Sequence, residues 1–169
     1  KFDRVQNAAP YYVGKLPVTA EPSPTDGQFS IHLGEAGSES FNCAFASCAN
    51  IAGTGSTFIS NKISGNFRQA GSGVTYLFNR KHVDTQQRDP VQTRVFYATK
   101  ITYPNGQTLT ITYQTFTQST DPLDPILVRP SRITSNLGYY IDITYASNVG
   151  TNAAWGMVQQ AALFRDTDT

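Results

Sequence analysis

One hairpin pattern is written twice in this chain, and the repeat limits what the chain can fold into. Residues 100–113 read KITYPNGQTLTITY, and residues 132–145 read RITSNLGYYIDITY. The segments align without a gap from first letter to last, and six of the fourteen positions are identical. Two unrelated hairpins can share isoleucines and threonines, but the constant offset and the matched basic start, glycine and final tyrosine favour a genuine repeat. A fixed period is typical of architectures in which each unit packs against the next.

Each copy predicts two short strands joined by a tight turn. Apolar residues alternate with threonines on both sides of the turn, so the apolar side chains share one face of each strand. Pro104 and Asn105-Gly106 form the first turn, and Gly138 ends the second. The matched positions are Ile101, Thr102, Gly106, Ile111, Thr112 and Tyr113 in the first copy, and Ile133, Thr134, Gly138, Ile143, Thr144 and Tyr145 in the second.

Most of the chain before the repeat also predicts β-strands. In QFSIHLG, which begins at Gln28, Phe29 and Ile31 face one side and Ser30 and His32 the other, as in a half-buried strand. A return strand is expected in FNCAFASCANI, followed by three short strands separated by glycines. KHVDTQQRDP is polar and predicts an exposed loop, after which VQTRVFYATKITY is again typical of a strand.

Local composition and residue patterning divide the chain into three parts. Residues 1–27 contain Pro10, Pro17, Pro22 and Pro24 and predict an extended N-terminal arm or linker. Residues 28–90 form a β-rich lead-in, and residues 91–169 form the hairpin repeat region. The only helix candidate, NAAWGMVQQAALFR at 152–165, has Asn152 as a helix cap but no clean apolar stripe, so a strand is favoured there.

Charge and hydropathy exclude several classes of partner. The net charge is +1, which gives no electrostatic reason to expect nucleic acid or an anionic membrane as partner. Only 15% of residues are charged, against about 25% in an ordinary globular protein. No stretch approaches the roughly 20 apolar residues of a membrane helix, so membrane insertion is not expected. The chain begins at Lys1, so either a leader was removed or this is a piece of a longer protein, and we favour the second.

Two cysteines lie close together in NCAFASC, at Cys43 and Cys48. In an exported protein this spacing closes a small disulfide loop, whose stabilisation is modest because the loop is short. Two free thiols are the alternative, and the sequence leaves both open. The pair lacks the nearby histidines of a zinc site, so no metal is expected.

Reactive side chains are few and dispersed. The two histidines, His32 and His82, lie near no nucleophile motif, and no phosphate-binding or dinucleotide-binding signature occurs. Solvated turns account for most of the aspartates, which are Asp84, Asp89, Asp121, Asp124 and Asp142. Aromatic side chains could stack on a sugar, but core packing is favoured for Trp155, Tyr11-Tyr12 and Tyr139-Tyr140. We therefore expect no catalytic residue and no cofactor.

The repeated pattern resembles the tyrosine-containing YD repeat of bacterial RHS proteins. The shared features are a basic residue before Ile-Thr, a turn with glycine, and a second strand that closes on Thr-Tyr. The match covers about residues 91–148, while residues 71–80 (GSGVTYLFNR) resemble a weaker unit and residues 28–41 the strand-rich lead-in. Gln114 and Ala146 follow the tyrosines here, where the family repeat has aspartate.

The resemblance implies a ribbon of antiparallel hairpins that spirals into a hollow shell and encloses or displays a C-terminal effector of a secreted or surface protein. Such shells need many repeats, so the chain is expected to be a fragment. The family's self-cleaving segment has no counterpart, and DPLDP at residues 121–125 is interpreted as a turn.

We therefore expect an all-β fold of antiparallel hairpins in a curved or spiralling sheet, with a β-sandwich as the alternative. The expected function is a non-enzymatic structural segment of an exported bacterial RHS/YD-type protein. Its partners are other segments of the same long chain or copies of itself. Two alternatives stay open, namely a subunit of an extracellular fibre assembled by edge-strand pairing and a β-sandwich module that binds carbohydrate or mediates adhesion.

Overall fold

The computed structural model is all-β, as the sequence predicts, and it describes most of the chain. The described residues are 11–17, 27–33, 37–44, 47–60, 64–83, 91–117, 126–150 and 152–166. The strands are β1 (Tyr11–Pro17), β2 (Gly27–His32), β3 (Ser38–Ala44), β4 (Ser47–Asn50), β5 (Thr57–Ser60), β6 (Gly65–Arg68), β7 (Thr75–Val83), β8 (Val91–Thr102), β9 (Thr108–Thr117), β10 (Ile126–Ser135), β11 (Tyr139–Tyr145) and β12 (Val158–Arg165), with a short 3-10 helix, η2 (Ala153–Gly156), before β12.

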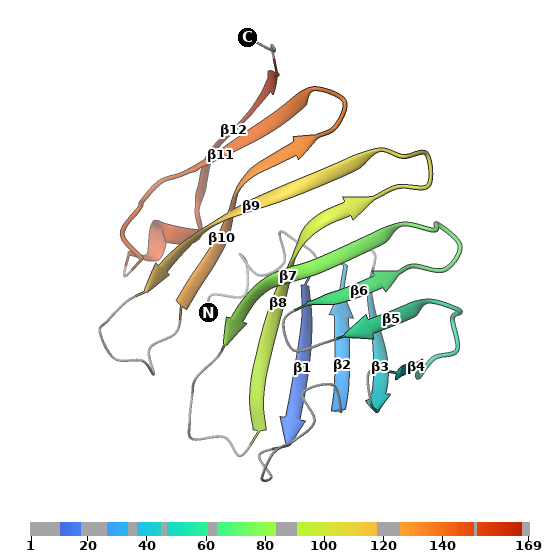
Figure 1. The fold of residues 1–169 in the computed structure, drawn as a ribbon. Coiled ribbons are helices and arrows are strands. Elements are labelled where there is room, and N and C mark those ends of the chain that lie inside the picture. The colour runs from blue at the N-terminus through green and yellow to red at the C-terminus, as the bar shows by residue number, and fades with distance from the viewer. Residues whose placement is uncertain are drawn as a thin grey trace.

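Strands β5 to β12 form one continuous antiparallel meander, which we call the ribbon (Figure 1). Every strand of the ribbon pairs with the strand that follows it in the sequence. Each step along the chain therefore adds one strand to the growing sheet. This is the arrangement that a stack of hairpins produces.

Strand β8 is the branch point of the sheet. It pairs with β7 through residues 94–102, with β1 through residues 91–97, and with β9 through residues 100–102. The stretch of β8 that pairs with β7 overlaps the stretches that pair with β1 and with β9. Strands β1 and β9 therefore lie end to end along the edge of β8 that faces away from β7. Strands β2, β3 and β4 then continue outward from β1. The N-terminal strands therefore leave the ribbon at β8 as a second arm of the same sheet.

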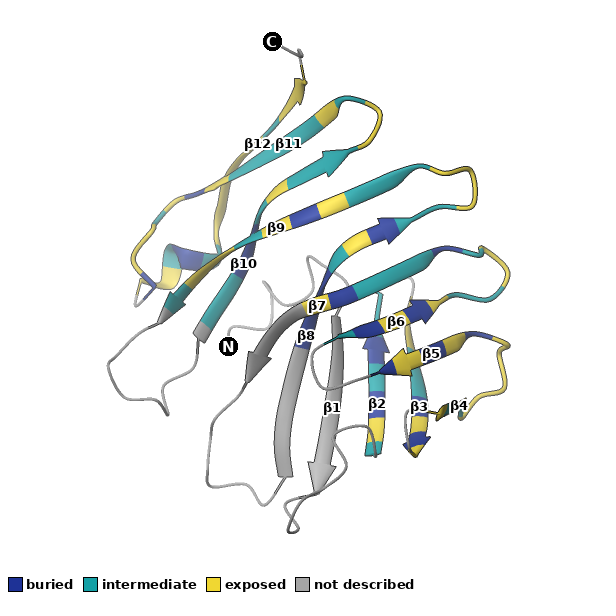
Figure 2. Ribbon diagram, in the orientation of Figure 1, coloured by how far each residue is buried: buried dark blue, intermediate teal, exposed yellow. Residues whose placement is uncertain are grey.

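The main core lies between these two arms of the sheet. Phenylalanine rings from β2 and β3 meet rings from β5 and β6, and Phe41 lies 5.5 Å from Phe58 and 6.0 Å from Phe67 between ring centroids. Alternation places these rings inward, because successive side chains of a strand point to opposite faces. The buried cluster comprises Phe29, Ile31, Phe41, Cys43, Phe58, Phe67, Phe78, Phe96 and Ala98 (Figure 2).

A second apolar surface, the apolar stripe, runs along one face of the ribbon from β7 to β12. Directly paired residues share a face of a sheet, and the pairs connect Ile101 with Leu109, Ile111 with Ile133, and Ile141 with Leu163. Burial decreases along this stripe. Val74, Ile101 and Ile111 are buried, Ile133 and Ile141 are half-buried, and Leu163 is 69% exposed.

Cys43 and Cys48 form a disulfide, with an S–S distance of 2.03 Å. The two residues are directly paired between β3 and β4, so the bond fastens the edge strand of the N-terminal arm. Next to it, the Glu39 carboxylate accepts hydrogen bonds from Asn50 Nδ2 at 2.7 Å and from Ser56 Oγ at 2.8 Å. These contacts hold the segment that leads from β4 to β5.

Two expectations about local structure differ from the observed fold, and a third is confirmed in large part. Residues 11–17 are not an arm or linker, because they form β1, which pairs on both edges. Residues 81–83 continue β7 rather than opening a loop, because they pair with β8. Residues 152–165 divide into η2, capped by Asn152, and β12, so the preference for a strand there is confirmed over most of the segment. The rest of the predicted arm and loop, and DPLDP, lie outside the described residues.

Candidate functional site: the repeated hairpin interface

The final tyrosine of each hairpin makes the same hydrogen bond. Tyr113 Oη donates to the carbonyl oxygen of Ala98, and Tyr145 Oη donates to the carbonyl oxygen of Pro130, each at 2.5 Å. Both bonds join residues that are 15 positions apart in the sequence. The donor and the acceptor of the second bond lie as far along the chain from those of the first as the second hairpin sequence lies from the first. We call these two tyrosines the closing tyrosines. The sequence repeat is therefore also a repeat of a tertiary contact, in which the second strand of each hairpin is fastened to the first.

A β-bulge recurs next to each acceptor carbonyl. In β8 the pairing with β7 shifts so that Thr99 is the extra residue, and in β10 the pairing with β9 shifts at Ser131. The extra residue follows directly after Ala98 and Pro130, whose carbonyls accept the tyrosine hydroxyls. A bulge bends the strand and re-aims its backbone groups, which explains why carbonyls at this position are available to a side chain.

The hairpin turns are equivalent and also contact one another. Gly106 and Gly138 have φ of 85° and 78°, values that favour glycine. Each donates its backbone N–H to the residue three positions earlier, Tyr103 at 3.0 Å and Ser135 at 3.3 Å. The Asn136 side chain accepts from Thr108 N at 2.9 Å and donates to the Gly106 carbonyl at 3.1 Å. Asn136 therefore fastens the second turn to the first.

The partner of the closing tyrosine differs between the two copies. Tyr97 packs against Tyr113, with 5.6 Å between ring centroids. The position equivalent to Tyr97 in the second copy is Arg129, whose guanidinium carbon lies 4.0 Å from the centroid of Tyr145. The second copy thus replaces an aromatic pair with a cation–π contact and places a charge inside the protein.

Arg129 is only 1% exposed, and its guanidinium is fully hydrogen-bonded without a carboxylate among the described partners. Nη1 donates to the carbonyls of Ser147 at 2.8 Å and Trp155 at 2.6 Å. Nη2 donates to Asn148 Oδ1 and, with Nε, to Gln114 Oε1. The Trp155 ring covers the group from 3.6 Å. Arg129 therefore joins β10 to β9 and to the segment between β11 and β12.

Trp155 and Gly150 complete the surroundings of Arg129. Trp155 is buried and lies 5.6 Å from Phe116 between ring centroids. A Cβ atom added at Gly150 would lie 1.8 Å from Phe116 Cδ1, so only glycine fits there without movement of the ring. The segment after β11 is therefore packed closely against β9, and Trp155 is part of the core rather than a surface platform for a sugar.

Burial changes the acid–base behaviour of the interface. Burial raises the pKa of Tyr113 well above its usual value, and the neighbouring Tyr97 adds to this rise. Burial also raises the pKa of Tyr145, although the charge of Arg129 opposes the change. Both hydroxyls consequently stay protonated at neutral pH and act as hydrogen-bond donors.

The opposite face of the ribbon is mainly polar but also carries an aromatic pair. Arg132 and Asp142 are paired between β10 and β11 and form an ion pair with Nε–Oδ1 at 2.5 Å. The Arg132 guanidinium also lies over Tyr140, which stacks on Phe164 of β12 at 5.2 Å. Asp142 is thus held by a cross-strand partner. The pair lowers the pKa of Asp142, chiefly through the hydrogen bond from Arg132.

The two histidines lie in different strands of the sheet. His32 lies in β2, where burial lowers its pKa, and His82 lies in β7. Asp84, Asp89, Asp121 and Asp124, and the side chains of Tyr11 and Tyr12, lie outside the described residues. Within the described part of the chain, no group of three or more His, Cys, Asp or Glu residues could hold a metal ion.

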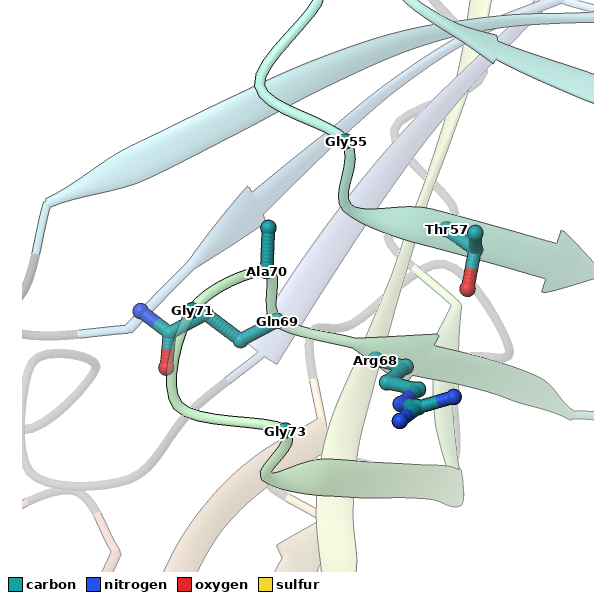
Figure 3. Close-up of a pocket in the computed structure, with 7 residues that line it drawn as sticks. All are labelled: Gly55, Thr57, Arg68, Gln69, Ala70, Gly71 and Gly73. Carbon is teal, nitrogen blue, oxygen red and sulfur yellow. The ribbon is translucent and has the colours of Figure 1, made fainter.

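A pocket lies where the turns before β5 and before β7 meet (Figure 3). Glycines form much of its wall, and Gly55, Gly71 and Gly73 all have positive φ, as tight turns between strands require. The side chains that line it are Thr57, Arg68, Gln69 and Ala70. Figure 3 shows Gln69 directed away from Arg68 and Thr57. The lining residues include no Asp, Glu or His, so they offer no paired acid and base.

The closing tyrosines were predictable from the sequence, but their acceptors, Arg129 and the bulges were not. The acceptors are backbone carbonyls, which any residue supplies, so no side-chain pattern marks them. Arg129 could have been found by extending the alignment of the two copies toward the N-terminus, because Arg129 aligns with Tyr97 when the same offset is kept.

Replacing a closing tyrosine with phenylalanine is expected to lower the free energy of unfolding by about 1–2 kcal/mol, because the acceptor carbonyl loses its donor while the ring still packs. Tyr113→Phe and Tyr145→Phe should have similar effects, measured by urea denaturation. Tyr139→Phe, at a 44% exposed position of β11, is the control and should change stability by less than about 0.5 kcal/mol. Equal effects of all three substitutions would contradict a specific role for the two closing contacts.

Stability is expected to fall as the pH rises above about 10, the usual tyrosine pKa. The folded-state pKa of Tyr113 is raised, so the unfolded chain releases its proton first, and stability that is complete below about pH 10 is lost as the pH rises toward the folded pKa. Urea midpoints at pH 8 and pH 11 measure this loss. The loss should be smaller in Tyr113→Phe than in the parent chain, and an unchanged loss would show that other groups cause it.

No family model, curated protein or solved structure matches the chain. Among the described residues, no helix has the length and apolar character needed to cross a membrane.

Proposed function

We propose that this chain is a non-enzymatic structural segment of an exported bacterial protein of the RHS/YD type, in which hairpins stack side by side to form a wall. Its work is to extend and hold a sheet that contributes to a shell or surface scaffold. The ribbon carries an apolar face and a polar face, as a wall between two environments does. Its partners are the neighbouring hairpins of the same polypeptide.

The observation that carries the proposal is the recurrence of the closing-tyrosine contact. Tyr113 and Tyr145 make the same bond, to carbonyls that are displaced along the chain by as much as the tyrosines themselves. Repetition of a tertiary contact is what a stacked architecture requires, because each unit must pack on the preceding one in the same way. A binding or catalytic site, in contrast, does not require the same set of contacts to occur twice in one chain.

The disulfide supports export. Disulfides persist in secreted, periplasmic and cell-surface proteins and are rare in reducing compartments. The bond between Cys43 and Cys48 fastens β4, an edge strand of the N-terminal arm. An edge strand of four residues gains from such a fastening, because it has few ladder hydrogen bonds of its own.

The mass of the native species tests this proposal. An antibody against the chain isolates the polypeptide from its natural source, and intact mass, light scattering and electron microscopy then give its length and shape. We expect a polypeptide much longer than 169 residues or a large hollow particle. A self-contained monomer of this length would overturn the proposal and direct attention to glycan binding.

A fibre subunit is the second candidate, and the exposed edge of β12 favours it. Val158 and Leu163 on this strand are 57% and 69% exposed, and open strand edges are templates for pairing between chains. A regular polymer of the 169-residue chain in the same measurement would place this candidate first.

A further inference from the structure

We propose that the outer edge of β12 is a docking site for an antiparallel strand that closes on a tyrosine, supplied by the next hairpin of the parent polypeptide. This inference rests on the proposed function, because it treats β12 as one step of the same stack. It adds the place, the direction and one specific contact of the incoming strand.

Strand β12 has the structure of a hairpin's first strand. Its pairing with β11 shifts between Thr144 and Tyr145, so that Gln159 is the extra residue. The bulge lies opposite a closing tyrosine, as in β10, where Tyr113 pairs with Pro130 just before the shift. Thr99 in β8 occupies the same place. Strands β8, β10 and β12 are therefore equivalent, although the sequence of β12 does not match the other two.

Strand β12 also has a backbone carbonyl at the position that accepts a closing tyrosine. In the two complete hairpins, the residue directly before the bulge accepts the hydroxyl of the closing tyrosine from the following strand. The equivalent residue of β12 is Val158, which pairs with Tyr145. The incoming tyrosine is therefore expected to donate its hydroxyl to the Val158 carbonyl.

The apolar stripe continues onto β12, where its residues are exposed. Val158 and Leu163 pair with Tyr145 and Ile141, so they share the face of the stripe. Among the described strands, β12 pairs only with β11 and ends the sheet (Figure 2). No proline or charged residue occurs between Val158 and Phe164, although edge strands that must stay unpaired usually carry such residues.

A labelled peptide with the sequence of residues 106–116, GQTLTITYQTF, is the probe. It contains the second strand of the first hairpin, including its closing tyrosine. We expect saturable binding to the 169-residue chain by fluorescence anisotropy. Backbone amides of β12 should exchange hydrogen more slowly when the peptide is bound, because they gain strand partners.

Two changes identify the site. The double substitution Val158→Lys with Leu163→Lys should weaken binding at least tenfold, because it places charges on the docking surface. Ile59→Lys, at the 63% exposed position of β5, is the matched control and should leave binding unchanged. In the peptide, phenylalanine in place of the tyrosine should weaken binding roughly threefold to tenfold, the value of one net hydrogen bond.

Three results would overturn the inference. They are no saturable binding at millimolar peptide, equal weakening by the β12 and β5 substitutions, and self-association of the chain through β12 seen by analytical ultracentrifugation. The last result would make a second copy the occupant. The native mass is measured independently, so a long native polypeptide with no peptide binding would reject only this inference. A native monomer of 169 residues would reject the proposed function and, with it, the next hairpin as the occupant of the β12 edge.

Discussion

Replacing Arg129 with methionine is expected to lower the free energy of unfolding by about 3–5 kcal/mol. The substitution removes every hydrogen bond of the buried guanidinium and leaves the carbonyls of Ser147 and Trp155 without this donor. Each buried acceptor left unsatisfied costs about 1–3 kcal/mol. The loss of the cation from between Tyr145 and Trp155 adds to this cost. Removing a buried charge also removes its desolvation penalty, which offsets part of the total.

Urea denaturation of the purified chain measures this effect, and two further variants show its cause. Arg129→Lys keeps the charge but lacks the planar fork that reaches several acceptors at once, so it should be only partly tolerated. Arg132→Met removes an exposed arginine that lies nearby on the same strand and should change stability much less. If Arg129→Met and Arg132→Met had the same effect, Arg129 would not be the structural centre of the second hairpin.

Replacing Phe41 with alanine is expected to cost about 3–5 kcal/mol. The Phe41 side chain of β3 is fully buried and contacts Phe58 and Phe67, which belong to the other arm of the sheet. Truncation removes part of the apolar surface that joins the two arms, and the surrounding rings, held by their own strands, close the cavity only in part.

Ile59→Ala is the matched control for Phe41→Ala. Ile59 lies in β5 beside Phe58 but is 63% exposed, so its truncation should change stability by less than about 0.5 kcal/mol. Both variants are compared by the urea midpoint under oxidising conditions, which keep the disulfide intact. A loss below about 1.5 kcal/mol for Phe41→Ala would show that the core can repack around the missing ring.

The strands of the ribbon were largely predictable from local pattern. Alternation of apolar residues with threonines fixes which side chains share a face, and glycines such as Gly106 permit the positive φ that a tight turn requires. These signals depend on near neighbours in the chain, so they can be found without the fold. The strand at residues 158–165 was harder, because VQQAALFR has neither clean alternation nor a clean helical stripe.

The position of β1 was not predictable in the same way. Residues 11–17 belong to a proline-containing stretch that is typical of an arm, yet they pair with β2 and with the distant β8. Pairing of this kind depends on which edges other strands leave open. The prolines that suggested a linker include Pro17, which is the last residue of β1, a position where a missing N–H is tolerated.

The sequence by itself determined that the chain is all-β and that one hairpin is written twice, because strand alternation and turn chemistry are local properties. Only the tertiary structure decided where the charge of Arg129 is buried, which carbonyls accept the closing tyrosines, and that β12 is equivalent to β8 and β10. Those features depend on the backbone and on register between strands, and a backbone carbonyl or a bulge can be supplied by almost any residue. The repeated structural contacts therefore extend further along the chain than the repeated sequence does.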